Sequence, residues 1–147
     1  MGNRLNRIDT LIGLAIVVAA SLCTGCGSDN PYDQVRIQGT ITYEDGVPIP
    51  GEHVTVTFIP QVEAVDPKIL PKNGHGELDS EGHIDHVTSY EVGDGVVPGK
   101  HKVVVVSRTE DGRPTGDVPP EYGDVLTTPL EIDTADTPFE LVVRRPG

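Results

Sequence analysis

Apolar and polar residues alternate with a period of two through most of the chain after residue 34. From Val35 to Tyr43, every second residue is apolar or glycine and the residues between are mostly polar. The stretch from Val54 to Pro60 repeats the pattern and ends at a proline, which cannot donate a ladder hydrogen bond. Successive side chains of a strand point to opposite faces, so the pattern predicts half-buried β-strands.

A turn sequence, Asp79-Ser80-Glu81-Gly82, lies between the next two alternating segments, Gly76 to Leu78 and His83 to Tyr90. The aspartate can cap a turn with its side chain and the glycine can adopt positive φ, so we expect a two-stranded hairpin. Lys100 to Arg108 contains the unbroken valine run Val103 to Val106. Such a run predicts a strand that lies centrally and is buried on both faces.

Two short strands, around Leu130 to Ile132 and at Phe139 to Val143, are expected to close the chain. Long polar segments that contain several prolines, Gln61 to Asn73 and Thr109 to Thr128, predict loops. No segment shows a helical stripe of useful length. Seven short strands in about 110 residues predict an all-β domain over residues 35–147, a seven-stranded antiparallel Greek-key β-sandwich.

The first 25 residues differ from the rest of the chain. Arg4 and Arg7 precede an apolar run of twelve residues, Leu11 to Leu22. A helix that spans a bilayer needs about 20 apolar residues, so the run indicates a secretory signal peptide. Thr24-Gly25-Cys26 resembles the lipobox of bacterial lipoproteins, with Cys23 at a position where that family prefers leucine.

The resemblance to the lipobox implies that Cys26 is the first mature residue. Its thiol would carry a diacylglyceryl group and its amine usually a third acyl chain, and two or three chains anchor a protein stably. Residues 26–34 would then form a lipidated tether. The alternative is ordinary secretion with cleavage after another small residue such as Ala20, which leaves Cys26 free or paired with Cys23.

Composition adds two constraints. Both cysteines of the chain lie in the signal region, so no disulfide framework supports the domain and an apolar core must stabilise it. Removal of residues 1–25 leaves nine basic and 22 acidic residues, a formal charge of −13. A surface this acidic repels phosphates, which argues against nucleic acid as a partner.

Several folding motifs are similar to those of carboxypeptidase regulatory-like domains. They are the glycine-initiated strand Gly39-Thr40-Ile41-Thr42-Tyr43, the turn at Asp45-Gly46, and the strand entry Pro98-Gly99-Lys100-His101, where His101 replaces an aromatic residue. Together with the lipobox, they resemble small lipoproteins common in planctomycete bacteria. The resemblance implies a transthyretin-like fold, with no assigned activity and no catalytic motif.

Candidate metal ligands lie on the expected hairpin. His75 and Glu77 share one strand face, and His83 with Asp85 would lie on the opposing strand. Two histidines and two carboxylates could hold a metal ion, although a polar solvent-facing surface explains the same residues. Calcium is a second candidate, with Asp79, Glu81 and Asp85 around the turn and Asp94 and Asp111 in other loops, but a type I turn accounts for the motif at Asp79 without an ion.

The expected function is a non-enzymatic module of the cell envelope, held at the membrane by lipid and without a cofactor. The mature chain offers no nucleophile elbow or triad. An envelope protein, peptide or glycan would bind at the edge strands and the two long loops. The alternatives are a small metal-dependent hydrolase that uses the histidine and carboxylate patch, and a plain envelope spacer. Gly27 is not the aspartate of an inner-membrane retention signal, which favours the outer membrane by resemblance to lipoprotein sorting.

Overall fold

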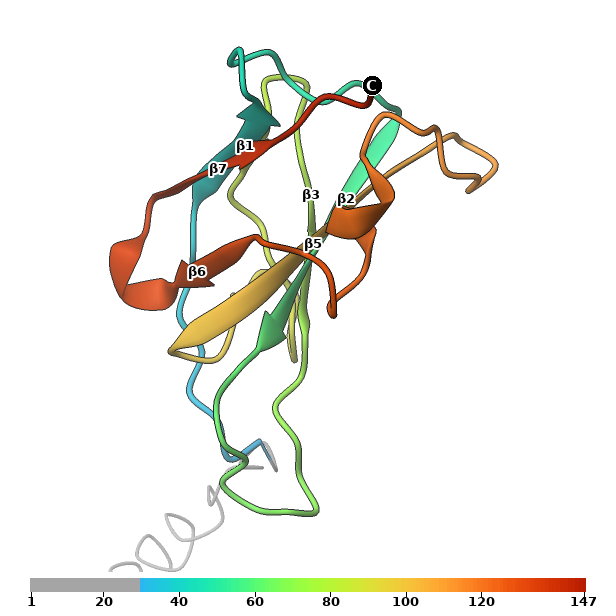
Figure 1. Ribbon diagram of the computed structural model, residues 1–147. Helices are drawn as coiled ribbons and strands as arrows, with labels where there is room; N and C mark the ends of the chain where they lie inside the picture. The colour runs from blue at the N-terminus through green and yellow to red at the C-terminus, as the bar shows by residue number, and fades with distance from the viewer. Residues whose placement is uncertain (1–29) are drawn as a thin grey trace, which may run out of the picture.

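The computed structural model of the protein describes residues 30–147, which form seven strands and two short 3₁₀ helices (Figure 1). The strands are β1 (Gly39–Tyr43), β2 (His53–Pro60), β3 (Gly74–Glu77), β4 (His83–Ile84), β5 (Lys100–Arg108), β6 (Glu131–Asp133) and β7 (Phe139–Val143). The 3₁₀ helices are η1 (Pro120–Gly123) and η2 (Thr134–Asp136). The all-β prediction is confirmed. The expected signal peptide and Cys26 lie outside the described residues.

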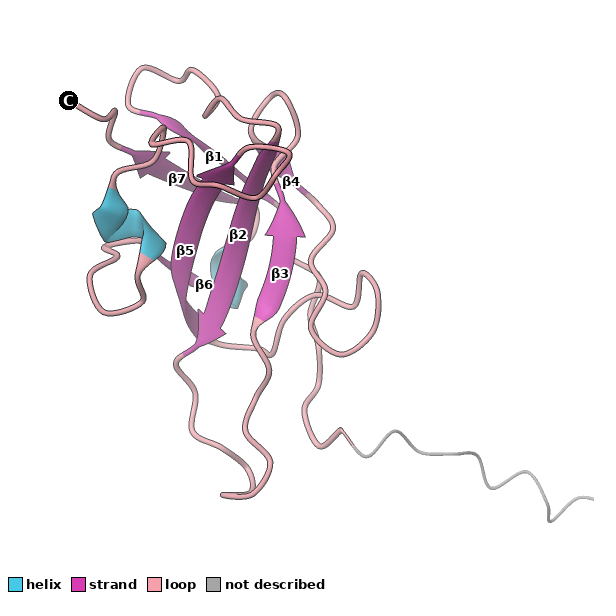
Figure 2. Cartoon of the chain, turned by 90° about the vertical axis from the view of Figure 1, so that its right-hand side faces the viewer, coloured by secondary structure: helices cyan, strands magenta, loops and turns pink. Residues whose placement is uncertain are grey.

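The strands form two sheets, in the orders β4-β1-β7 and β3-β2-β5-β6 (Figure 2). The inward residues of both sheets form one apolar cluster. At its centre the ring of Phe58 on β2 meets the ring of Phe139 on β7 edge to face, with centroids 5.8 Å apart. Two sheets with a shared apolar core are consistent with the expected β-sandwich.

The expectation of a purely antiparallel fold is wrong for one strand pair. β1 and β7 pair in parallel over five residue pairs, from Gly39 with Phe139 to Tyr43 with Val143. The chain enters β7 from the other sheet, after β6 and η2, so no tight hairpin forces the antiparallel direction. A Cβ atom on Gly39 would lie 2.5 Å from the Phe139 carbonyl oxygen, which explains why this strand begins with glycine.

The predicted hairpin forms only in part: its turn closes, and His75 pairs antiparallel with Thr88 through two backbone hydrogen bonds of 2.9 Å. The Gly82 N–H donates to the Asp79 carbonyl at 3.0 Å, and the Asp79 N–H donates to the His83 carbonyl at 2.9 Å. Between the turn and this bridge the two segments do not form a regular ladder, because β3 pairs with β2 in one sheet and β4 pairs with β1 in the other. Ile84 is buried in the core, so β4 contributes to the sheet that β3 faces. The turn therefore carries the chain from one sheet to the other.

β5 has the predicted bounds and the predicted central place, next to β2. Its burial is different from that expected. Val103 and Val105 are fully buried, whereas Val104 and Val106 are half-buried on the outer face. The first strand is shorter than expected, since it starts at Gly39 and Val35 makes only an isolated bridge.

His101 is a fully buried polar residue near the start of β5. Its Nδ1 lies 3.1 Å from the Gly99 carbonyl oxygen, so Nδ1 carries the proton, and Nε2 has no hydrogen-bond partner among residues 30–147. Burial lowers the pKa of His101 below its ordinary value of 6.5, against the raising effects of the Gly99 carbonyl and the charge of Asp133. The core therefore holds this imidazole in its neutral form.

We expect the stability of the fold to decrease as the pH falls below about 6.5, the ordinary pKa of histidine. Below that pH, His101 is protonated in the unfolded chain but stays neutral in the folded chain, where its pKa is lower. A single group of this kind changes the free energy of unfolding by at most about 1.4 kcal/mol per pH unit. His101→Phe should flatten the dependence between about pH 5 and 7.5 in urea unfolding, and His86→Gln, at a highly exposed position, should not. Equal slopes for the wild type and His101→Phe would contradict this assignment.

Candidate functional site

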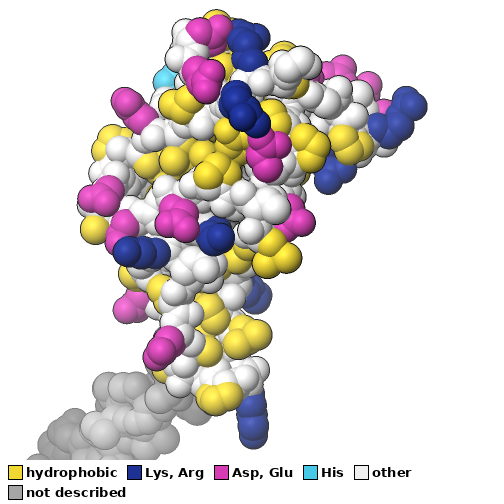
Figure 3. Space-filling model, viewed as in Figure 1, with side chains coloured by type: hydrophobic (Ala, Val, Ile, Leu, Met, Phe, Trp, Pro, Cys, Tyr) yellow, Lys and Arg dark blue, Asp and Glu magenta, His cyan; other side chains and the backbone are white. Residues whose placement is uncertain are grey.

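An apolar groove with a volume of about 820 Å³ lies at one end of β5. Three segments that are distant in sequence line it: residues 105–108 of β5, residues between 114 and 124 of the following loop, and the tail formed by residues 144–147. Valine, proline and glycine make up most of the lining. In the space-filling view, apolar side chains gather in a band across the upper half of the face shown, with charged side chains of both signs around it (Figure 3).

Side-chain hydroxyls fix the walls of the groove to the sandwich. Tyr43 on β1 donates its hydroxyl hydrogen to the Asp117 carbonyl at 2.7 Å. The Tyr122 hydroxyl on η1 accepts the Arg144 N–H at 3.1 Å, which links the loop to the tail. The Thr115 N–H donates to the Ser107 carbonyl on β5 at 3.1 Å. The long loop is therefore an ordered wall.

The floor of the groove is the part of the β5 edge that β6 does not pair. β6 pairs with β5 only at residues 100–102. Beyond that, the Val103 N–H donates to the Leu130 carbonyl at 2.9 Å, and the Val103 carbonyl accepts the Thr128 hydroxyl at 2.7 Å. The backbone groups of Val103 thus point away from β2, and those of Val105 and Ser107 do the same because alternate residues of a strand share a side.

Val105 has no partner on that side. Among residues 30–147, no loop or cap backbone group and no side chain hydrogen-bonds to the Val105 N–H, the Val105 carbonyl oxygen or the Ser107 N–H. Val105 is fully buried and lines the groove. Buried backbone groups are almost always paired, so two donors and one acceptor with ladder spacing mark a place where another backbone could bind if the loop that covers Val105 shifts.

The groove is locally more positive than the rest of this acidic chain. Three arginines and one acidic residue line it, Arg108, Arg144, Arg145 and Asp124, whereas the whole chain has a formal charge of −12. Arg144 forms an ion pair with Glu121. The Arg145 guanidinium lies 2.8 Å from the Asp45 carboxylate, and its hydrogen bonds lower the pKa of Asp45.

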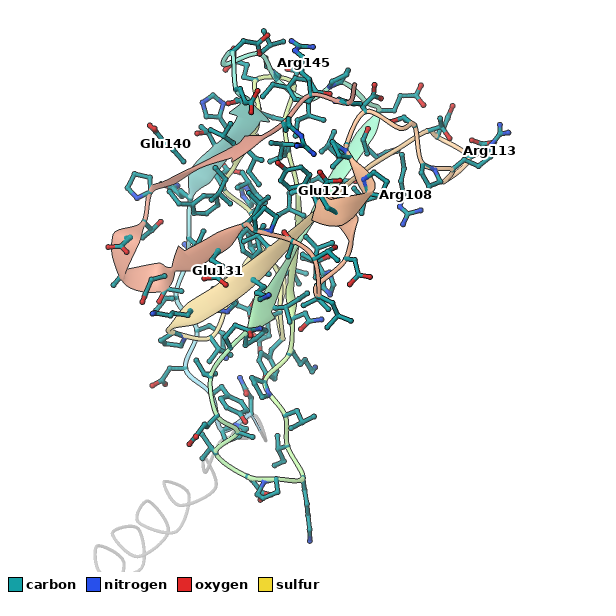
Figure 4. The ribbon with its side chains drawn as sticks, in the orientation of Figure 1. Arg108, Arg113, Glu121, Glu131, Glu140 and Arg145 are labelled. Carbon is teal, nitrogen blue, oxygen red and sulfur yellow. The ribbon has the colours of Figure 1, made fainter. Side chains whose placement is uncertain are left out.

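Among the three arginines that line the groove, Arg108 is the one whose guanidinium forms no ion pair within residues 30–147. Its side chain extends from the end of β5, and Arg145 extends from the tail beyond β7 (Figure 4). Nη1 of Arg108 donates to the Gly112 carbonyl at 2.9 Å. In the part of the chain that the structure describes, no carboxylate lies within 4.0 Å of this guanidinium. It can therefore pair with an acidic group of a partner.

The four sequence-predicted metal ligands contact separate partners. Glu77 lies 3.2 Å from His53 across the sheet. His75 Nδ1 lies 3.3 Å from the Thr57 hydroxyl, and Asp85 lies 2.5 Å from the neighbouring His86. His83 is 3.5 Å from Asp79 and 3.6 Å from Glu81, at the turn. The geometry that would place all four on one hairpin is lost because β3 and β4 belong to different sheets.

Among residues 30–147, one set of three potential ligand residues has its ligand atoms within 4.8 Å of one another: Asp79, Glu81 and His83, all exposed. The geometry gives Asp79 a structural role. Its Oδ1 accepts the Glu81 N–H at 2.9 Å and the His83 N–H at 2.8 Å. The backbone hydrogen bond from His83 is the main reason that the pKa of Asp79 is lowered. The carboxylate is occupied in closing the turn.

The remaining calcium candidates are similarly engaged. Both carboxylate oxygens of Asp94 accept backbone N–H groups, from Ser89 at 2.8 Å and from Tyr90 and Glu91 at 3.0 and 2.9 Å. These bonds lower the pKa of Asp94, although partial burial raises it. Asp111 forms an ion pair with Arg113 at 2.6 Å. Each carboxylate orders its own loop.

Sequence reasoning missed the open edge of β5 and Arg108. The expected strand lengths could have indicated the unpaired edge. The sequence predicts nine residues for β5 and only about three for the strand near residue 131. A long strand beside a short one leaves part of its edge unpaired. The loop with Pro119 and Pro120 was expected at the surface, but its packing over that edge depends on contacts distant in sequence.

Comparisons of the chain with protein-family models, with curated proteins and with solved structures found no match. Within residues 30–147, no helix is long and apolar enough to cross a membrane.

We expect Asp79→Ala to lower the midpoint of urea unfolding, because two backbone N–H groups lose their acceptor. Glu81→Ala is the matched control, since its carboxylate accepts no hydrogen bond from the backbone of the turn among the described residues. Both variants are measured with and without zinc or calcium. A midpoint that rises with either ion in the wild type and not in Asp79→Ala would contradict the structural role and indicate a metal site.

Proposed function

We propose that the protein is a non-enzymatic, lipid-tethered binding module of the cell envelope, and that its groove takes an extended peptide segment of an envelope protein. The observation that carries the proposal is an apolar groove over the part of the β5 edge that β6 leaves unpaired, with the backbone groups of buried Val105 beneath it. Strand addition to an open sheet edge is a common mode of peptide recognition, in which main-chain hydrogen bonds give affinity. We also propose that the fold is of the transthyretin-like, carboxypeptidase regulatory-like type.

The groove chemistry favours a peptide over a glycan. A glycan needs many side-chain donors and acceptors, whereas valine, proline and glycine dominate this lining. The polar groups that the floor offers are backbone groups two residues apart, at Val105 and Ser107, which match the repeat of a β-strand. Arg108, three residues beyond Val105, favours a segment that also carries an acidic side chain.

The alternative of a metal-dependent hydrolase has less support. It requires His75, Glu77, His83 and Asp85 to converge around one ion and a water molecule. In the structure these side chains contact different partners on two sheets. No observation favours this activity over a binding role.

Lipid attachment at Cys26 gives the module its location. The signal-like apolar run and the Thr24-Gly25-Cys26 motif support processing by the lipoprotein pathway. Anionic headgroups would repel an expected mature chain with a formal charge of −13, so acyl chains would supply the membrane affinity. By resemblance to lipoprotein sorting, Gly27 favours the outer membrane, with the domain outside the cytoplasm.

We expect Cys26→Ser produced in a Gram-negative host to carry no acyl chains in its intact mass, because the variant lacks the thiol that starts lipoprotein processing. Cys23→Ser is the matched control and should keep its acyl chains. Intact mass of the wild type should correspond to a chain that begins at acylated Cys26. A mature wild-type mass without acyl chains, or an acylated Cys26→Ser variant, would contradict the tether.

We expect a photo-cross-linking residue at Pro120 to capture a partner peptide in membranes of the source bacterium, while one at Glu131, on exposed β6, captures none. Gly123→Leu should abolish the Pro120 adduct, because a side chain at this position projects into the groove and its Cβ would meet nothing closer than 3.8 Å. Arg108→Gln should reduce the adduct about tenfold, as expected for loss of a charged hydrogen bond. Arg113→Gln is the charge control outside the groove. Equal adducts at residues 120 and 131 would overturn the groove as binding surface.

A further inference from the structure

The loop of residues 61–73, between β2 and β3, exposes apolar side chains at its tip. Val65 is 71%, Ile69 40% and Leu70 68% exposed. A tight turn orders the tip, since the Ile69 N–H donates to the Asp66 carbonyl at 2.9 Å and the Lys68 N–H donates to the Asp66 carboxylate at 2.8 Å. Several large apolar side chains held outward by an ordered turn are a feature that a partner normally covers.

Tyr32 fixes this loop to the start of the domain. The Tyr32 hydroxyl donates to the Ile69 carbonyl at 2.6 Å and accepts the Val65 N–H at 3.1 Å. The Tyr32 ring stacks on Tyr90, with centroids 6.5 Å apart. Tyr90 in turn accepts the Lys72 N–H at 3.1 Å. Two long-range hydrogen bonds and a ring stack therefore make the loop and the first described residues one unit.

The position of this unit follows from the length of the tether. Tyr32 is six residues from Cys26, and a fully extended chain covers at most about 3.5 Å per residue, so Tyr32 lies within about 21 Å of the acylated residue. The loop projects from the same end of the domain at which the described chain begins, away from the C-terminal tail (Figures 1 and 2). The argument for a membrane at this end rests on the proposed lipidation.

The charge of the loop suits a lipid surface. Glu63 and Asp66 balance Lys68 and Lys72, so the segment is formally neutral in a chain with a net charge of −12. Anionic headgroups repel it less than the rest of the domain. The Lys72 ammonium lies 4.7 Å from the centroid of the Tyr90 ring, whereas the Lys68 stem at the tip can place its ammonium group at headgroup level while the tip enters the acyl boundary.

We propose that the loop of residues 61–73 inserts Val65, Ile69 and Leu70 into the interfacial region of the bilayer that holds Cys26. A patch of this size binds lipid weakly by itself. The tether converts its binding into an intramolecular event at high effective concentration. The loop is then a second contact that sets the orientation of the domain, with the groove directed away from the lipid.

A single-cysteine label tests the inference directly. Cys26 is the only cysteine of the expected mature chain, and under the proposed lipidation its sulfur is blocked as a thioether to the diacylglyceryl group, so Leu70→Cys supplies the one reactive thiol. The lipidated protein, labelled there with an environment-sensitive fluorophore, is reconstituted in phosphatidylethanolamine and phosphatidylglycerol vesicles. Nitroxide lipids should quench the Leu70→Cys label at least about twofold more than a label at Leu126→Cys, which is 85% exposed in the loop around the groove.

The outcomes separate the two proposals. If the lipidated protein sediments with vesicles but aqueous iodide quenches both labels equally, the tether stands and membrane insertion of the loop is overturned. If the protein does not sediment with vesicles, the lipid tether fails and the loop inference fails with it. Val65→Asp combined with a label at Ile69→Cys is a second check, because the added charge should reduce nitroxide quenching while sedimentation through Cys26 is unchanged.

Discussion

The pairing of β2 with β5 is the constraint on which the rest of the structure depends. Eight consecutive residue pairs fix the register of these two central strands, and that register places Val56, Phe58, Val103 and Val105 in the core. Since the described domain contains no cysteine, this packing has no covalent support. The edge of β5 that faces away from β2 forms the floor of the groove. The loop of residues 61–73 begins where β2 ends, at Pro60. One ladder thus determines the positions of both surfaces.

The sequence predicted individual strands better than their partners. A period-two pattern and its breaks report which residues are extended, so β5 and β7 were located at their observed bounds. The turn at Asp79 is a local feature that forms whether or not its flanking strands pair with each other. Their separation into two sheets depends on burial of Ile84 against the opposite sheet, and the parallel pairing of β1 with β7 joins residues about 100 positions apart. No local signal carries that information.

The candidate site shows the same limit more strongly. Titratable side chains are visible in a sequence, so His75, Glu77, His83 and Asp85 attracted a chemical interpretation. The groove depends on backbone groups and on walls from three segments of the chain. Neither feature corresponds to a recognisable residue type or motif in the sequence. What the sequence did contain was the prolines of the loop after β5, which cannot supply N–H groups and so cannot close its edge by a regular ladder.

The parallel pairing of β1 with β7 has a mechanical consequence. The two strands run in the same direction, so the beginning of β1 and the end of β7 lie at opposite ends of their ladder. A pull between the segment before Gly39 and the tail after Val143 acts along the strands. All five residue pairs then bear the load together in shear, whereas an antiparallel hairpin would open one bond at a time. The β1 and β7 pairing therefore resists stretching between the segment before Gly39 and the tail that borders the groove.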